Sequence, residues 1–112
     1  MNPNAGIMRL LLSALRNLAA DAQTQLESLK RGEVWNVDEL ALEHEHWAHS
    51  AIRAGILTPD QAAAVIELDT FLDQISGKEN ARLWTREALR TAPEWEKARE
   101  LARAALGLLP AG

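Results

Sequence analysis

Residues 36–55, NVDELALEHEHWAHSAIRAG, carry the best-defined helix signal in this chain of 112 residues. Asn36 can cap the first turn of a helix, and the Glu39 side chain can return a hydrogen bond to the backbone of the cap. Apolar residues then recur at the spacing of one helical face, and Gly55 supplies a left-handed stop. The stretch therefore predicts an amphipathic helix between Asn36 and Gly55.

The same kinds of signal indicate four further helices. They cover residues 5–31, about 59–76, about 79–91 and 93–106. The first has one unbroken amphipathic pattern. The second opens with Thr58, Pro59 and Gln61, which predict a capping box around a proline at the first helical position. Alternating runs of β-branched and aromatic residues, which are typical of strands, are absent from the sequence.

Short connections of two to five residues join the predicted helices, and such connections favour antiparallel neighbours. The length fits one domain. The chain has no cysteine, which excludes disulfide frameworks, thiolate metal sites and cysteine nucleophiles. The sequence therefore predicts an all-α protein, a compact bundle of about five helices with antiparallel neighbours, in one domain over residues 1–112.

The longest apolar stretch near the start, residues 7–12, is interrupted by Arg9. It is far shorter than the ~20 apolar residues that a membrane-spanning helix needs. A secretory signal would place its charge before the apolar block and a small-residue cleavage site after it. We therefore expect a cytoplasmic protein with no membrane partner.

The net charge of −4 is unevenly distributed along the chain. Residues 33–76 hold nine acidic side chains and one basic side chain, whereas residues 1–32 and 77–112 each carry a net charge of +2. An acidic surface attracts a basic partner and speeds its association. The pI of about 5.3 lacks the basic footprint that phosphate contacts require, so nucleic acid is not an expected partner.

Two polar residues lie within apolar helical faces. His44 falls among the apolar positions of the helix over residues 36–55, and Asp69 falls among those of the helix over residues 59–76. If these helices pack side by side, the two side chains can form a buried pair that raises the pKa of the histidine and lowers that of the aspartate. A His–Asp couple is also part of a hydrolytic triad, but no Ser or Thr lies in the strained turn that a nucleophile needs. We therefore predict a structural pair and no catalytic residue.

Residues 43–49 combine histidine with glutamate. Glu43 and His46 have the i, i+3 spacing of carboxylate-bridged di-iron helices, and His46 and His49 repeat it. A di-iron site needs a matching motif on a second helix, however, and all three histidines of the chain lie in this one segment. A zinc site made of one or two of these histidines with glutamate is chemically allowed. The favoured interpretation is a solvated polar face with no metal and no cofactor.

Two leucines, Leu10 and Leu42, fall on the polar sides of their predicted helices. If they converge, they would mark a dimer or partner surface. Dimerisation through the first helix, with Leu10 and Leu12 in the contact, is a further possibility, so a monomer and a homodimer both stay open. Trp35, which precedes a helix, is expected to be the most exposed of the four tryptophans.

The C-terminal third combines a Ser-Gly-x-Glu-Asn turn over residues 76–80 with a helix that contains Trp84. The segment Pro93-Glu94-Trp95-Glu96 then opens the last helix. This pattern resembles a segment of small bacterial all-helical proteins of uncharacterised function, most closely over residues 77–106, and residues 37–43 fit as well. The resemblance implies a bacterial cytosolic origin. It brings no known activity, so it assigns no functional residue.

These features together predict a small non-enzymatic protein-interaction module, such as an immunity protein, an inhibitor or a regulatory adaptor, whose partner is a protein with a basic surface. The acidic face of the helices over residues 36–55 and 59–76 is the predicted contact. The predicted partner-binding residues are Glu39, Glu43, Glu45, His46 and His49. The alternative is a small helical metal-binding protein or enzyme built around His44, His46 and His49.

Overall fold

Seven helical segments account for most of residues 3–110, the part of the chain that this computed structural model describes. They are α1 (Pro3–Ala19), α2 (Ala22–Lys30), α3 (Val37–Ala54), α4 (Pro59–Gln74), the 3₁₀ helix η1 (Lys78–Leu83), α5 (Arg86–Thr91) and α6 (Pro93–Leu108). No strand occurs in this range, so the all-α prediction is confirmed, with more helices than the five predicted. None of the described helices is both long and apolar enough to cross a membrane.

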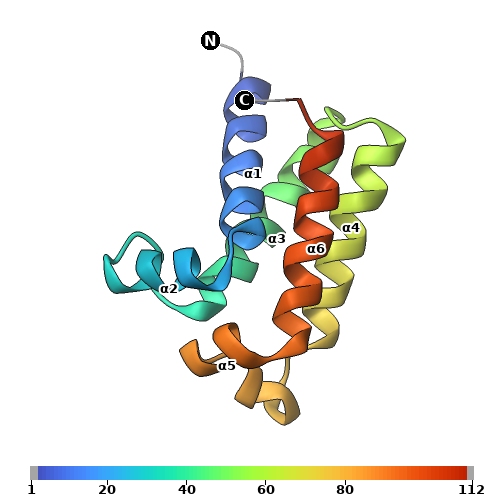
Figure 1. The fold of residues 1–112 in the computed structure, drawn as a ribbon. Coiled ribbons are helices and arrows are strands. Elements are labelled where there is room, and N and C mark those ends of the chain that lie inside the picture. Colours follow the sequence, from blue (N-terminus) through green and yellow to red (C-terminus); the bar gives the residue numbers. More distant parts are fainter. Residues whose placement is uncertain (1–2, 111–112) are drawn as a thin grey trace.

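The four longest helices surround the apolar core. α1 lies against α3 and α6, and α6 lies against α4 (Figure 1). The first turn of α4 meets the end of α6, where the Gln61 side chain donates to the Leu108 carbonyl at 2.9 Å. Trp95 of α6 is fully buried, and its indole N–H donates to the Leu83 carbonyl at 2.6 Å. The radius of gyration, 13.6 Å, is that of a compact chain of this length.

The predicted starts of α3 and α4 are confirmed. Asn36 caps α3, because its side chain accepts a hydrogen bond from the Glu39 amide at 2.9 Å. Thr58 and Gln61 form the expected capping box at the start of α4. Gly55 ends α3 with a φ of 69°, the left-handed conformation that glycine adopts at little cost. These local features set the starts of both helices and the end of α3, and the two helices together carry 8 of the 16 acidic residues of the chain.

The predicted single helix over residues 5–31 is wrong, because the chain forms α1 and α2 instead. Asp21 has an extended backbone and caps α2, and its carboxylate accepts a hydrogen bond from the Thr24 amide at 2.8 Å. The apolar periodicity stays in phase across the break, so the pattern alone predicts one continuous helix. An acidic cap in the middle of an amphipathic pattern was the signal of the break.

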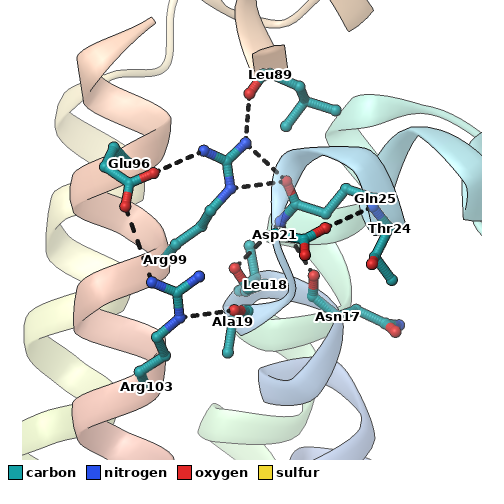
Figure 2. A network of polar contacts seen from close by, with 10 residues as sticks. All are labelled: Asn17, Leu18, Ala19, Asp21, Thr24, Gln25, Leu89, Glu96, Arg99 and Arg103. Carbon is teal, nitrogen blue, oxygen red and sulfur yellow. Dashed lines mark hydrogen bonds and ion pairs between the residues drawn. The ribbon is translucent and has the colours of Figure 1, made fainter. Parts of the chain in front are cut away.

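Gln25 and Arg99 form a buried polar network that joins α2 to α6 (Figure 2). The side-chain amide of Gln25 donates to the carbonyls of Asn17 and Leu18 at the end of α1, each at 3.1 Å. Its oxygen accepts two hydrogen bonds from the Arg99 guanidinium, at 3.0 and 2.9 Å, and Arg99 also donates to the Leu89 carbonyl. Arg99 is only 3% exposed. The network therefore gives partners to a buried cation and to the last turn of α1.

Replacing Asp21 with alanine is expected to loosen the first turn of α2, because the Thr24 amide loses its acceptor. The same hydrogen bond lowers the pKa of the Asp21 carboxyl, so the cap persists to a lower pH than an ordinary aspartate would allow. In native-state hydrogen exchange measured by NMR, we expect faster exchange at Thr24 and unchanged exchange in α3. The Asp21→Asn variant keeps an acceptor and serves as the control. Unchanged exchange at Thr24 in Asp21→Ala would show that the turn forms without the cap.

The predicted helix over residues 79–91 is replaced by two shorter helices, η1 and α5. Trp84 separates them with a backbone conformation, φ −102° and ψ 45°, that leaves the helical region. Its indole N–H donates to the Ile75 carbonyl at 2.8 Å, which ties the side chain to the end of α4. Thr85 then caps α5, since its hydroxyl accepts a hydrogen bond from the Ala88 amide at 3.1 Å. The tertiary contact of Trp84 therefore interrupts a pattern that is locally helical.

Candidate functional site

A groove of about 680 Å³ lies between α3, the second half of α4 and η1. Its lining comes from three parts of the chain: Asp38, Ala41, Leu42 and Glu45 from α3; Asp69, Thr70, Leu72, Asp73, Ser76 and Gly77 from α4 and the turn after it; and Lys78, Ala81 and Trp84 from η1 and the residue that follows it. We call this surface the acidic groove.

The acidic groove combines negative charge with apolar surface. Its charged residues are four carboxylates and one lysine, namely Asp38, Glu45, Asp69, Asp73 and Lys78. Leu42 is 56% exposed, whereas Leu72 is buried beneath the groove. Surfaces of this kind attract cations at long range and provide apolar contact once a ligand has docked.

The η1 end of the acidic groove is fixed by hydrogen bonds and aromatic packing. Trp84 is bonded to the Ile75 carbonyl, and its ring meets the Trp95 ring edge to face with the centroids 5.1 Å apart. The Asn80 side chain donates to the carbonyl of Ser76 at 3.0 Å and to that of Gln74, the last residue of α4, at 3.3 Å. Gly77 turns the chain out of α4 with a φ of 101°, which other residues rarely adopt. These contacts preform the wall of the groove.

The same surface of α3 and α4 continues beyond the acidic groove. His49 Nε2 lies 3.2 Å from Asp69 Oδ2, and this contact joins the two helices at the edge of the groove. Ile52 of α3 is 37% exposed and Ile66 of α4 is 49% exposed, and each lies about one helical turn farther from the acidic groove than this contact. Each is three residues from a member of the His49–Asp69 pair and therefore shares its helical face. We call the acidic groove and this apolar turn together the α3/α4 face.

The five residues predicted to bind a partner are divided between two sides of α3. Glu45 lines the acidic groove, and His49 lies beside it. His46 is exposed, and its ring packs edge to face on Trp47 outside the groove. Of the predicted set, only Glu45 and His49 belong to the α3/α4 face.

Glu39 and Glu43 line a smaller cavity, about 200 Å³, between α3 and α1. A hydrogen bond from one carboxyl group to the other, together with burial, raises the pKa of Glu39. The cap of α3 consists of the bond from the Glu39 amide to Asn36, without the predicted return bond from the Glu39 side chain. Leu10 lines this smaller cavity whereas Leu42 lines the acidic groove, so the two leucines do not converge. Leu12 is buried in the core and is not available for the dimer contact considered above.

His44 lies in the core with none of its surface exposed. Its Nε2 atom is 3.1 Å from the Val65 carbonyl oxygen, so Nε2 carries the proton and donates. Nδ1 is buried and has no hydrogen-bond partner among the described residues. Burial lowers the pKa of this imidazole, the opposite of the predicted direction. The predicted His44–Asp69 pair is replaced by two other contacts, His44 with the Val65 carbonyl and Asp69 with His49.

The three histidines do not point to a common site. His44 is in the core, His49 contacts Asp69, and His46 packs on Trp47. Within residues 3–110, no group of three or more His, Asp or Glu side chains is arranged to hold a metal ion. The geometry of the described residues therefore gives the metal-binding alternative no support.

Sequence reasoning missed most of the acidic groove. Asp38, Leu42 and Glu45 have the i, i+4, i+7 spacing of one helical face, so the α3 wall could have been read from the sequence. Lys78 and Trp84 reach the groove only because the chain turns sharply after α4 and forms η1. Helical periodicity contains no information about such a turn.

Comparisons of the chain with protein-family models, with curated proteins and with solved structures find no match. The resemblance of residues 77–106 to small bacterial all-helical proteins therefore stays a prediction. The charge and shape of the α3/α4 face are the basis on which a function can be assigned.

Proposed function

We propose that this protein is a non-enzymatic interaction module that binds a basic segment of another protein on the α3/α4 face. The proposal rests above all on the acidic groove, whose lining combines four carboxylates with the exposed Leu42 side chain. The carboxylates attract a basic partner before contact, and the apolar floor adds contact area after docking. Inhibitors, immunity proteins and regulatory adaptors are modules of this kind.

A second copy of this chain fits the α3/α4 face poorly. A two-fold dimer through this face would place the same acidic side chains opposite one another, and like charges at a contact oppose binding. If the face instead met the basic C-terminal region of another copy, a closed dimer would require both reciprocal contacts to form around one two-fold axis, and otherwise the contact would be head-to-tail. These arguments favour a different protein as the partner.

Phosphate-bearing partners also fit the acidic groove poorly. Its carboxylates repel the phosphates of nucleic acids and the head groups of anionic lipids. A basic polypeptide is the macromolecule whose charge complements this surface. The cytoplasm stays the predicted place of this interaction.

A binding role is favoured over a hydrolytic one by the side chains around the His49–Asp69 pair. Such a pair can act with a serine that passes its proton to the histidine. The hydroxyl of Ser76, the serine in the lining of the acidic groove, instead donates to the Leu72 carbonyl at 2.8 Å. This hydroxyl is engaged with the backbone of α4 rather than with His49.

Titration with a defined cationic peptide tests the proposal. The probe is a peptide of leucine and lysine, about 18 residues long, which is about five helical turns. Its control is the peptide in which glutamate replaces every lysine. At low salt, we expect the cationic peptide alone to bind, with an affinity that falls as the salt concentration rises.

Charge-reversal variants locate the binding surface in the same titration. Glu45→Lys and Asp73→Lys are each expected to lower the affinity for the cationic peptide by roughly tenfold, since each reverses one charge in a wall of the acidic groove. Glu67→Lys makes the same change in net charge on the other side of α4, outside the groove, and is expected to have little effect. Equal weakening by all three variants would show unspecific attraction and would overturn the proposal.

A further inference from the structure

We infer that the basic segment is an amphipathic helix whose apolar stripe lies along the α3/α4 face, an inference that rests on the proposed function. The face offers apolar contact at both ends, with Leu42 in the acidic groove and Ile52 with Ile66 beyond it. Glu45 and the His49–Asp69 contact lie between these ends, and Asp38 lies about one turn beyond Leu42. Apolar contacts at both ends, with carboxylates of α3 and α4 on either side of the line between them, match a ligand whose apolar residues form one line with bases beside it.

The spacing of the apolar contacts sets the length of the ligand. Leu42 and Ile52 are ten residues apart in one helix, so about 15 Å separates them along the axis of α3. A partner helix lying along α3 would meet both contacts with apolar residues about three turns apart. In helix-in-groove complexes the anchors recur at i, i+3 or i+4, and i+7, which is about two turns, so a ligand that spans this face needs a further anchor at i+10 or i+11.

The charges of the face place the basic residues of the ligand. Glu45 lines the acidic groove from α3, and Asp73 lines it from α4, so carboxylates stand on both sides of the apolar floor. A helix lying between them meets an acid on each side of its apolar stripe. We therefore expect lysine or arginine on both flanks of the stripe. Lys78 is the base in the lining, so the ligand residue nearest to it is expected to be polar or acidic.

The surroundings of the face favour a helical ligand over an extended one. An extended peptide needs backbone partners, which proteins usually supply from the edge of a sheet. Residues 3–110 contain no strand, so this part of the chain offers no such edge. A helix satisfies its own backbone hydrogen bonds and needs only apolar contact and countercharge from the surface. The α3/α4 face offers both.

Two cationic peptides of identical composition test the inference. In the first, which is about 18 residues long, the leucines follow one helical face; in the second, the same residues are shuffled so that no face is apolar. We expect the first peptide to bind at least about tenfold more tightly in calorimetric titrations. We also expect it to gain helix content on binding, measured by circular dichroism of the mixture after subtraction of the protein spectrum.

Variants at the two ends of the face identify the apolar contacts. Leu42→Gln and Ile66→Gln are each expected to lower the affinity for the amphipathic peptide by roughly tenfold, because each removes apolar area that the ligand would cover. Leu108→Gln changes a similarly exposed leucine on α6 and is expected to leave the affinity unchanged. Because all three side chains are about half exposed, the variants are expected to fold, and thermal unfolding of each variant verifies this.

The outcomes separate this inference from the proposed function. Equal affinity for both peptides, with no gain of helix, would overturn the helical ligand and leave the acidic docking surface in place. Absence of binding by either peptide at low salt would overturn the proposed function itself. If the protein alone self-associates in sedimentation experiments, and Ile66→Gln abolishes the association, the occupant is a second copy and both proposals fail.

Discussion

The Arg99→Met variant is expected to lose about 2–4 kcal/mol of unfolding free energy, the largest effect that we expect from one substitution outside the apolar core. Arg99 is 3% exposed and donates to the Gln25 side chain and to the Leu89 carbonyl. Methionine fills similar space but donates no hydrogen bond. Two buried oxygens from different parts of the chain would then lose a charged donor.

Urea unfolding followed by circular dichroism measures the loss. Arg90→Met is the matched control, because Arg90 is exposed and pairs with Glu87 on the surface of α5; its effect is expected to stay within about 0.5 kcal/mol. The double variant Gln25→Leu with Arg99→Met is expected to lose less unfolding free energy than the sum of the losses in the two single variants, since each single change leaves the other side chain without its hydrogen-bond partner. A loss below about 0.5 kcal/mol in Arg99→Met would show that the network does not hold α2 to α6.

His44 is expected to make the protein sensitive to acid. Burial lowers the pKa of its imidazole below the ordinary 6.5, and protonated Nδ1 would find no acceptor in the core. Between the folded and the unfolded pKa the unfolded chain binds more protons, so stability is retained above about pH 6.5 and falls as the pH decreases. Asp69 nearby opposes the lowering of the pKa, and His49 adds to it. For one proton, the loss is at most about 1.4 kcal/mol per pH unit.

The His44→Leu variant isolates this effect, because it keeps an apolar side chain in the core and cannot titrate. We expect wild-type stability relative to His44→Leu to fall between about pH 7 and about pH 5 in urea unfolding series. His44→Ala is expected to lose about 2–4 kcal/mol at about pH 7, because it also leaves a cavity and removes the donor to the Val65 carbonyl. Parallel pH profiles of wild type and His44→Leu would contradict the burial of a neutral imidazole.

The helices that the sequence predicts well are those whose ends depend on local hydrogen bonds. The caps at Asn36 and Thr58 bond to amides three residues away, so short motifs are sufficient to find them. The break after α1 has a local signal in the Asp21 cap, but its packing also involves Gln25, whose partner Arg99 is 74 residues away. Arg99 itself has the i, i+3 spacing to Glu96 that is typical of an exposed helix surface, and its burial has no local signal.

The candidate site was predicted in outline only. The block of acidic residues pointed to the two helices that line the acidic groove, and Glu45 and His49 lie on or beside the groove. Glu39 and Glu43 lie on another side of α3. They were included in the predicted surface because a charge count along the chain does not record the direction of side chains. The pairing of Asp69 with His49 depends on how α3 and α4 pack, which a single-helix pattern cannot give.

The position of a bound cationic amphipathic peptide tests the central claim most directly, and tryptophan indole N–H signals in NMR spectra report it. Trp84 lines the acidic groove. The Trp47 indole instead donates to the Glu43 carboxylate on another side of α3, so Trp47 reports on acidic surface outside the groove. At low salt, we expect titration with the peptide to shift the Trp84 signal and the backbone amides of Leu42 and Asp73, with the Trp47 signal nearly unchanged. A larger shift at Trp47 than at Trp84 would place the peptide outside the acidic groove and contradict the assignment of the α3/α4 face as the docking surface.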